Sequence, residues 1–132
     1  MTIPLRGELW KIRTPLIEKD RPALVITPGK DNATNGGAIV IPTSTGGFRS
    51  NAAMLRLQPP EAGVQETCFL LPNMLHFLEF ETCVIEITPQ GYKQVKDKRF
   101  KTFIKKLGEL DRDRLEDIEM YLYRLLGLSA LD

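Results

Sequence analysis

"DRPALVIT", residues 20 to 27, places two charged residues and a proline directly before a run of apolar and β-branched residues. An apolar run of this kind is typical of a buried strand. Pro22 fixes its own backbone and restricts Arg21 to extended conformations, so we expect Arg21 at the mouth of that strand. An arginine in this place either forms a surface ion pair or offers its planar fork to a phosphate.

Other segments of the first two thirds of the chain have the same strand-like character. They are rich in β-branched, leucine and aromatic residues and are separated by turns rich in Gly, Pro and Asn. Their spacing predicts a small, strongly bent antiparallel sheet or barrel. We expect a hairpin that turns at 89–91. The segments are 7–12, 38–42, 53–57, 67–71 and 82–87.

The end of the chain has helical periodicity. A first helix is expected from Phe100, Phe103, Ile104 and Leu107, with Gly108 as its stop. A second helix is expected after the N-cap candidate Asp111, or from a competing capping box at Asp113 and Glu116. Its apolar stripe consists of Leu115, Ile118, Leu122 and Leu125, and Gly127 follows its last turn.

Length and composition predict one soluble, cytoplasmic domain over residues 1–132. Hydrophobic residues are 42% and charged residues 27% of the chain, and the formal net charge is +1. We expect no membrane span and no signal peptide, because no apolar run is long enough for a span and no basic region precedes one. Cys68 and Cys83 are interpreted as small core residues in a reducing compartment.

Charge is unevenly distributed near the end of the chain. Between Lys93 and Lys106 the sequence has seven Lys or Arg residues and one acidic residue, Asp97. Such a run forms either a basic surface patch or an ordinary solvated face.

The common signatures of catalysis and cofactor binding are missing from the sequence. It contains no GxGxxG, Walker, HExxH or GxSxG motif, so we expect no cofactor and no metal site. The one histidine, His76, lies among apolar neighbours and is either a hydrogen-bonded, partly buried residue or an acid–base catalyst.

Polar residues at strand ends are the remaining candidates. Thr43, Ser44 and Thr45 leave the 38–42 strand into a loop that also carries Arg49. If that strand neighbours the one after Arg21, hydroxyls and guanidinium converge at one rim and can bind phosphate. The alternative is that the hydroxyls cap a turn and Arg21 forms an ion pair.

Four motifs in this order give a family resemblance. Arg6-Gly7-Glu8-Leu9-Trp10, Arg21-Pro22-Ala23-Leu24-Val25-Ile26, Ile41-Pro42-Thr43-Ser44 and the ending "LGELDRDRLEDIEMYLYRLLGL" resemble the MazF/PemK family of toxin–antitoxin endoribonucleases. The resemblance implies an α+β, mainly β fold, a small SH3-like antiparallel barrel (CcdB/MazF-like) with C-terminal helices. It also implies a homodimer, metal-independent cleavage of single-stranded RNA, and neutralisation by a cognate antitoxin.

The resemblance also assigns roles to residues. Arg21 is the implied catalytic arginine, Thr43 and Ser44 bind the scissile phosphate, and Glu8 with Trp10 is structural. Thr45, Arg49, Lys93 and Lys96 are further candidates for phosphate or RNA binding. In such enzymes the 2′-hydroxyl of the RNA is the nucleophile, so the protein orients the phosphate and offsets its charge.

The sequence departs from the family pattern in two places. The family commonly carries an Arg-Thr-x-Asp tract where residues 71–77 read LPNMLHF, so Leu75 replaces the second arginine. His76 is the candidate to take over acid–base work; alternatively, the protein is an inactive binder of RNA or a CcdB-like topoisomerase inhibitor on the same fold. Residues 78–95 are an insertion that is atypical of the family.

Overall fold

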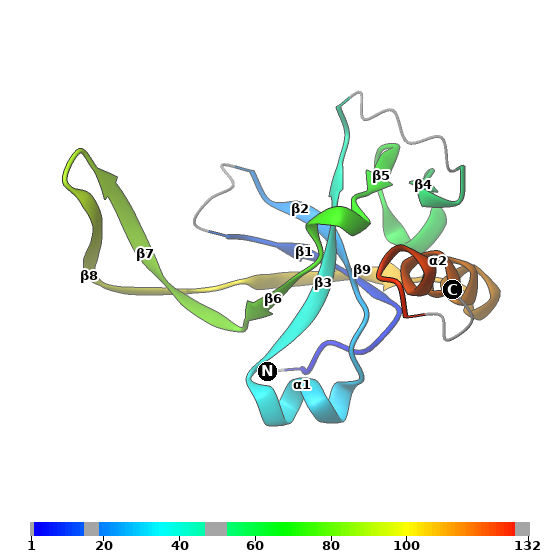
Figure 1. The fold of residues 1–132 in the computed structure, drawn as a ribbon, viewed down its shortest axis with the longest axis horizontal. Coiled ribbons are helices and arrows are strands. Elements are labelled where there is room, and N and C mark those ends of the chain that lie inside the picture. The colour runs from blue at the N-terminus through cyan, green and yellow to red at the C-terminus, as the bar shows by residue number, and fades with distance from the viewer. Residues whose placement is uncertain (1, 15–18, 47–52, 129–132) are drawn as a thin grey trace.

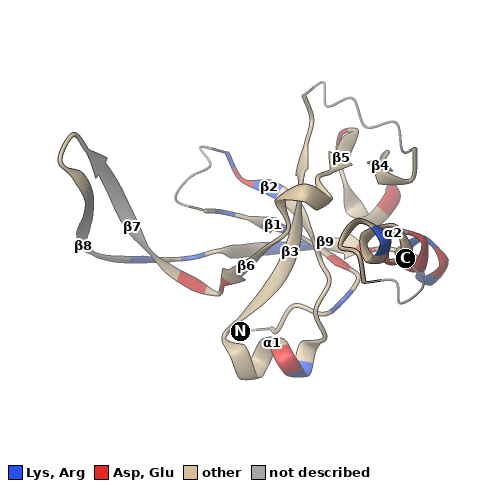
Figure 2. Cartoon of the chain, in the orientation of Figure 1, with Lys and Arg blue, Asp and Glu red and all other residues tan. Residues whose placement is uncertain are grey.

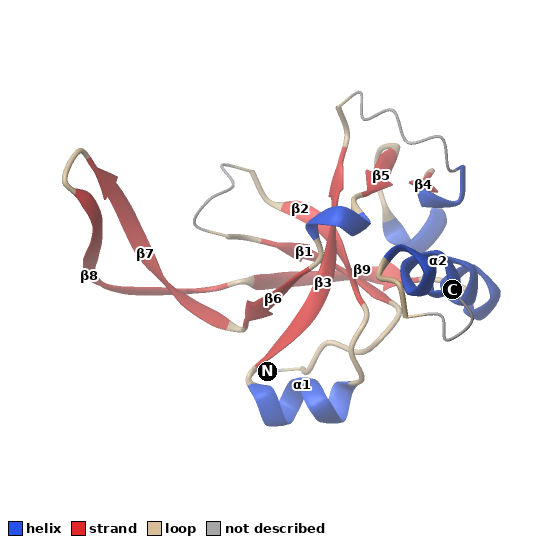
Figure 3. Ribbon diagram, in the orientation of Figure 1, coloured by secondary structure: helices blue, strands red, loops and turns tan. Residues whose placement is uncertain are grey.

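The computed structural model describes residues 2–14, 19–46 and 53–128, with the backbone alone at 83–88 and 92–98. Figure 1 shows its strands and helices, and Figure 3 shows them by type. The strands are β1 (Glu8–Ile12), β2 (Arg21–Val25), β3 (Gly37–Ser44), β4 (Arg56–Leu57), β5 (Cys68–Leu70), β6 (His76–Glu79), β7 (Glu81–Thr88), β8 (Gly91–Lys101) and β9 (Phe103–Glu109). The helices are α1 (Gly29–Asn35) and α2 (Arg112–Leu125), with short 3-10 turns η1 (Ala53–Leu55), η2 (Glu61–Gly63) and η3 (Pro72–Met74).

Seven strands form one curled antiparallel sheet. Its order is β4-β5-β3-β2-β1-β9, and β6 pairs with the long strand β3 beside this path. The sheet curls into a half-open barrel, with α2 against one side (Figure 1). The expected class, a mainly β α+β fold built on a small antiparallel barrel, is confirmed. Of the two helices, only α2 follows the last strand, since α1 connects β2 to β3.

Two clusters of buried side chains lie on the two faces of the central strands. Alternate residues of β1 and β2 supply both clusters, because successive side chains of a strand point to opposite faces. The first cluster includes Leu9, Leu24, Ile41, Leu57, Leu70 and, from α2, Leu115, Ile118 and Leu122. The second includes Trp10, Ile12, Ala23, Val25, Ala38, Val40, Leu78 and Phe103. Three of the four predicted stripe residues of α2 are therefore core, whereas Leu125 is exposed.

Glu8 is a buried carboxylate at the start of β1. Its Oε1 accepts hydrogen bonds from the backbone N–H of Leu5 at 2.8 Å and from Trp10 Nε1 at 3.0 Å, and its Oε2 lies 2.8 Å from Lys106 Nζ. These contacts tie the first strand to β9. Burial by itself raises the pKa of Glu8, but the hydrogen bonds from Lys106, Trp10 and Leu5 outweigh it, so the pKa lies below its ordinary value.

The helix expected at residues 100–107 is wrong. Residues 91–101 and 103–109 are strands, and β9 pairs antiparallel with β1. Two register shifts in this pairing leave Ile104 and Leu107 without a partner residue in β1. These β-bulges break the alternation of the strand and give its apolar residues a spacing that imitates a helix.

The stretch between the predicted strands 20–27 and 38–42, where only a turn was expected, contains the short helix α1. Its end at Gly36 adopts a left-handed conformation, with φ of 69°, as helix ends favour. Asn32 is buried and its amide donates to the carbonyls of Pro4 at 2.7 Å and Thr27 at 2.9 Å. The helix is held by this side chain, which periodicity cannot reveal.

β7 and β8 form a long ribbon that projects from the barrel (Figure 1). The predicted hairpin is confirmed, since Thr88 pairs with Gly91 across its turn. The ribbon is a separate two-stranded sheet and does not extend the seven-stranded one by pairing. It covers most of the segment 78–95 that the sequence suggested as an atypical insertion.

Two glycines allow η2 to lie directly against β9. Gly63 has φ of +79°, and a Cβ built there would lie 1.9 Å from the carbonyl oxygen of Leu107. A Cβ on Gly108 would lie 2.5 Å from the carbonyl carbon of Ala62. Gly108, interpreted from sequence as a helix stop, is therefore required by close backbone packing.

We expect Gly63→Ala to lower the free energy of unfolding by about 3 kcal/mol, because left-handed strain and overpacking add. Gly36→Ala is the matched control, since Gly36 also has positive φ but has no atom within 4 Å of a built Cβ. Its expected loss is about 1 kcal/mol from conformation alone. Urea denaturation of both variants measures the difference, and equal losses would contradict the packing argument.

Candidate functional site

Arg21 is the first residue of β2 and lies opposite Ile12 of β1. Because Ile12 belongs to the second core cluster, Arg21 extends from the open end of that same face. Its side chain is half-buried, and within the described ranges it makes no hydrogen bond or ion pair. The guanidinium is therefore available to an anion.

The neighbouring acid, Asp20, is committed to another arginine. Arg13 Nε and Nη2 lie 2.9 and 3.0 Å from the two carboxylate oxygens of Asp20, a fork-to-fork pair that joins the ends of β1 and β2. Hydrogen bonding from Arg13 holds the pKa of Asp20 below its ordinary value. Because Asp20 is paired with Arg13, it does not neutralise Arg21, although the two residues are adjacent in sequence.

Thr43 is buried at the end of β3, with 2% of its surface exposed. Its hydroxyl donates to the carbonyl oxygen of Pro22 at 2.6 Å. A hydroxyl has one proton to donate, and in this structure Thr43 donates it to Pro22, the residue next to Arg21, and not to a ligand. Burial raises the pKa of the adjacent Cys68 thiol, and a hydrogen bond with Thr43 partly offsets this effect.

The structure divides the predicted phosphate-binding residues between two faces. β2 and β3 are neighbours, with Ala23 opposite Pro42, and continuing this register brings Arg21 opposite Ser44. By strand alternation, Thr43 and Thr45 point to the other face. Ser44 Oγ lies 3.3 Å from the backbone nitrogen of Gly46, which is the turn-capping contact that the sequence left as an alternative.

His76 begins β6 and lies opposite Val40 of β3. Its Nδ1 is 2.8 Å from the carbonyl oxygen of Met74, so the neutral ring donates from Nδ1 and leaves Nε2 as an acceptor. Val40 and Ser44 are four residues apart, about 13 Å along the strand. The structure therefore does not bring His76 beside Arg21.

The remaining predicted residues lie away from the ends of β2 and β3 that carry Arg21 and Ser44, or they fall outside the described residues. Arg49 falls in 47–52, which the structure does not describe. Lys93 and Lys96 are positions of β8 in the projecting ribbon, where the backbone alone is described. Leu75, at the place of the second family arginine, is half-buried and packs against the first core cluster.

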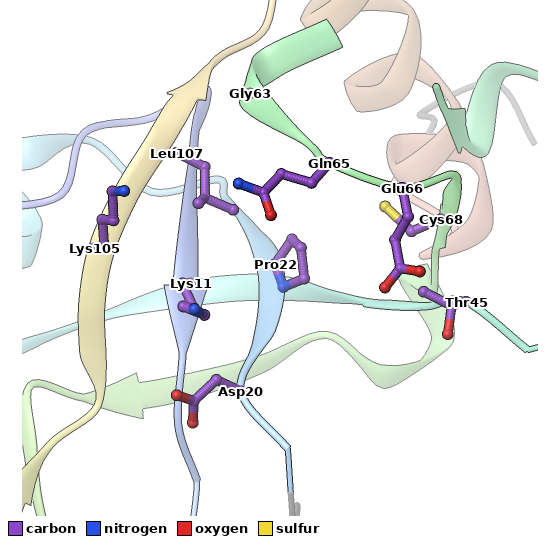
Figure 4. A pocket seen from close by; sticks show the side chains of 10 residues that line it. All are labelled: Lys11, Asp20, Pro22, Thr45, Gly63, Gln65, Glu66, Cys68, Lys105 and Leu107. Carbon is purple, nitrogen blue, oxygen red and sulfur yellow. The ribbon is translucent and has the colours of Figure 1, made fainter. Parts of the chain in front are cut away.

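A cavity of about 180 Å³ lies on the opposite face of the sheet from Arg21, and sequence reasoning missed most of its lining. Figure 4 shows side chains from β1, β9, the ends of β2 and β3 and the segment before β5 surrounding it. Figure 2 shows that the basic positions of β1, β2 and β9 lie near one another. The cavity is lined by Lys11, Asp20, Pro22, Thr45, Gly63, Gln65, Glu66, Cys68, Lys105 and Leu107.

The residues that the structure describes provide few other sites for chemistry. Among them, no three His, Cys, Asp or Glu side chains cluster in a way that could hold a metal ion. No helix formed by these residues is long and apolar enough to cross a membrane.

The fold is similar to that of several solved structures. MazF in the MazE–MazF complex (Form-II) from Deinococcus radiodurans has a TM-score of 0.61 and 21% identity, covering 98% of this chain and 100% of that chain. An endoribonuclease in complex with its cognate antitoxin, from a mycobacterial species, has a TM-score of 0.62 and 16% identity, covering 96% of each chain. No family model and no curated protein matches the sequence. The curled barrel, its helices and these similarities over nearly the whole chain show that the chain has the MazF fold.

Proposed function

We propose that this protein is the toxin of a toxin–antitoxin pair and acts in the cytoplasm as an endoribonuclease on single-stranded RNA. The fold shared with a MazF and a mycobacterial endoribonuclease supports this proposal. The observation that carries it is Arg21, a half-buried residue at a strand mouth with no side-chain partner in the described part of the chain. Its unpaired guanidinium is free to bind an anion, and a backbone phosphate fits its planar fork.

The proposed reaction needs no metal ion and no nucleophile from the protein. A general base takes the proton of the RNA 2′-hydroxyl, the 2′ oxygen attacks the adjacent phosphorus, and the bond from phosphorus to the 5′ oxygen of the next nucleotide breaks. The departing 5′ oxygen takes up a proton from a general acid or from water. The products are a 2′,3′-cyclic phosphate and a 5′-hydroxyl end. Arg21 remains protonated and stabilises the negative charge that develops on the phosphate oxygens.

Ser44 and Thr43 have different proposed roles in this reaction. Ser44 shares the face of Arg21 and donates to the same phosphate once its turn contact is exchanged. Thr43 binds the phosphate only if its hydroxyl leaves the Pro22 carbonyl; while that bond persists, Thr43 acts by fixing the backbone that carries Arg21. Thr45, Arg49, Lys93 and Lys96 are proposed to contact the RNA backbone further from the scissile bond.

His76 is the proposed acid–base group, since it is the one imidazole in the chain and the contact with Met74 leaves its Nε2 free. Because the register places His76 about 13 Å along β3 from the position opposite Arg21, His76 can act only if the bound RNA brings its 2′ or 5′ oxygen within hydrogen-bond reach of Nε2. Leu75 favours the alternative function, a catalytically inactive RNA binder, because its packed side chain supplies no charge where the family has an arginine.

The proposal includes two protein partners, a cognate antitoxin and a second copy of the chain. Chains with this fold occur in solved MazE–MazF and endoribonuclease–antitoxin complexes. The end of α2 and the residues after it expose large apolar side chains, which suit a protein contact. These are Met120, Tyr123, Leu125, Leu126 and Leu128.

The test is incubation of the purified protein with a mixed pool of single-stranded RNA in the presence of EDTA. We expect discrete cuts that leave cyclic phosphate and 5′-hydroxyl ends, mapped by ligation and sequencing. Cleavage that EDTA abolishes would contradict the metal-free mechanism. If folded protein that is free of antitoxin cuts no RNA, the proposal that it is an endoribonuclease is wrong. The alternative of a catalytically inactive RNA binder then remains.

A further inference from the structure

Two lysines face each other across the β1–β9 ladder. Lys11 and Lys105 are directly opposite in the register, and both line the 180 Å³ cavity. Like charges directly opposite on one face of a sheet destabilise it. In the part of the chain that the structure describes, neither lysine forms an ion pair. The next residue, Lys106, does have a buried acidic partner in Glu8.

The acids near this lysine pair do not neutralise it by ion pairing. Asp20 lies on the cavity wall and attracts Lys11 electrostatically, but its two oxygens are bound by Arg13 and it forms no ion pair with Lys11. Glu66 lines the cavity beside Gln65, away from the two lysines in Figure 4, and its carboxylate forms no ion pair with a described residue. The cavity therefore has a cationic wall and a wall that carries a carboxylate and an amide.

The cavity adjoins the proposed cleavage site. Pro22 lines it, and the preceding residue is Arg21 on the other face of the sheet edge. Thr45 also lines it, one residue after Ser44. A strand of RNA whose phosphate binds Arg21 would therefore cross the end of β2 to place its neighbouring nucleotide in this cavity.

We propose that this cavity is a nucleotide subsite, in which Lys11 and Lys105 hold a backbone phosphate and Glu66 selects the base. The inference rests on the proposed function. An ionised carboxylate only accepts hydrogen bonds, so its two oxygens pair best with guanine, whose N1–H and N2 amino group donate side by side. Adenine and cytosine place a ring-nitrogen acceptor beside their amino group, and uracil has carbonyl oxygens on both sides of its N3–H. The Gln65 amide both donates and accepts and completes the contact to the base edge.

The phosphate contact is tested by salt dependence, with RNA that cannot be cut. A fluorescent single-stranded pool with every 2′-hydroxyl methylated is titrated by anisotropy at several salt concentrations. We expect Lys11→Gln and Lys105→Gln each to reduce the slope of log affinity against log salt by about 0.7, the value for one single-stranded phosphate contact. Their melting temperatures stay equal or rise, because a like-charge opposition is removed. Lys30→Gln, an exposed lysine on α1, is the control with an unchanged slope.

The base contact is tested by the cleavage pattern. We expect Glu66→Gln to weaken a preference for guanine at one position near the cut, while Glu79→Gln, at an exposed glutamate of β6, leaves the pattern unchanged. Unchanged salt slopes in both lysine variants, or an unchanged pattern in Glu66→Gln, would overturn the subsite. If the parent protein cuts no RNA, the proposed function fails, whereas the slopes still decide whether the lysines bind phosphate.

Discussion

Arg21→Ala is expected to reduce the rate of RNA cleavage by about 10²–10³-fold, the usual effect of removing one group that stabilises transition-state charge. The side chain contributes little to the fold, because it makes no hydrogen bond or ion pair with described residues. Thermal unfolding should therefore stay within a few degrees of the parent. The rate is measured with a single RNA chosen from the mapped cuts, at enzyme excess, so that binding and cleavage are separated.

Arg21→Lys is the informative companion of this variant. It retains the charge but loses the planar fork, so we expect an intermediate rate. Arg124→Ala is the matched control, since it removes an exposed arginine of α2 on a different element. Equal rates for Arg21→Ala and the parent would remove Arg21 from the site. A large drop in melting temperature would show instead that the residue is structural.

Glu8→Ala is expected to lower the free energy of unfolding by about 3 kcal/mol at neutral pH, because it leaves the Trp10 indole and the Lys106 ammonium without their acceptor. Glu109→Gln is the control. Glu109 also approaches Lys106, at 4.0 Å, but its side chain is 73% exposed, so the expected change is below about 0.5 kcal/mol. Urea denaturation followed by tryptophan fluorescence measures both variants.

The stability that Glu8 provides depends on pH in a defined direction. Its pKa is lower in the folded protein than its ordinary value of about 4.3, so the unfolded chain takes up the proton first. The contribution is complete above that ordinary value and is lost as pH falls through the lower, folded value. The difference between the parent and Glu8→Gln should therefore shrink on acidification below about pH 4. A difference that grows in acid would contradict this sign.

The central strands could be predicted because each is a local feature. Pro22 and the apolar run after it predict β2. An apolar stripe predicts α2, and its residues Leu115, Ile118 and Leu122 lie in the core. The family resemblance rests on these same segments. Asp111 does occupy the N-cap of α2, although its side chain makes no capping hydrogen bond.

What could not be predicted depends on contacts between distant segments. The bulges at Ile104 and Leu107 exist because β9 must follow β1, and a window of sequence contains no information about that partner. Predicting a helix at 100–107 also concealed the role of Lys105. Its position opposite Lys11 arises only from the pairing of β9 with β1. Likewise, the sequence predicts that Thr43 and Ser44 face opposite sides of the sheet, but only the register shows that Ser44 is the one that shares the face of Arg21.

The ribbon of β7 and β8 has a consequence for how this protein can change over evolutionary time. Among the described strands, β7 and β8 pair only with each other. Residues 89 and 90 at their turn are exposed. Lengthening, shortening or replacing this arm therefore leaves the hydrogen-bond ladders of the barrel intact, so we expect mutations there to cost little in folding stability. The arm is a segment in which new binding specificities can arise while the barrel and its Arg21 edge are conserved.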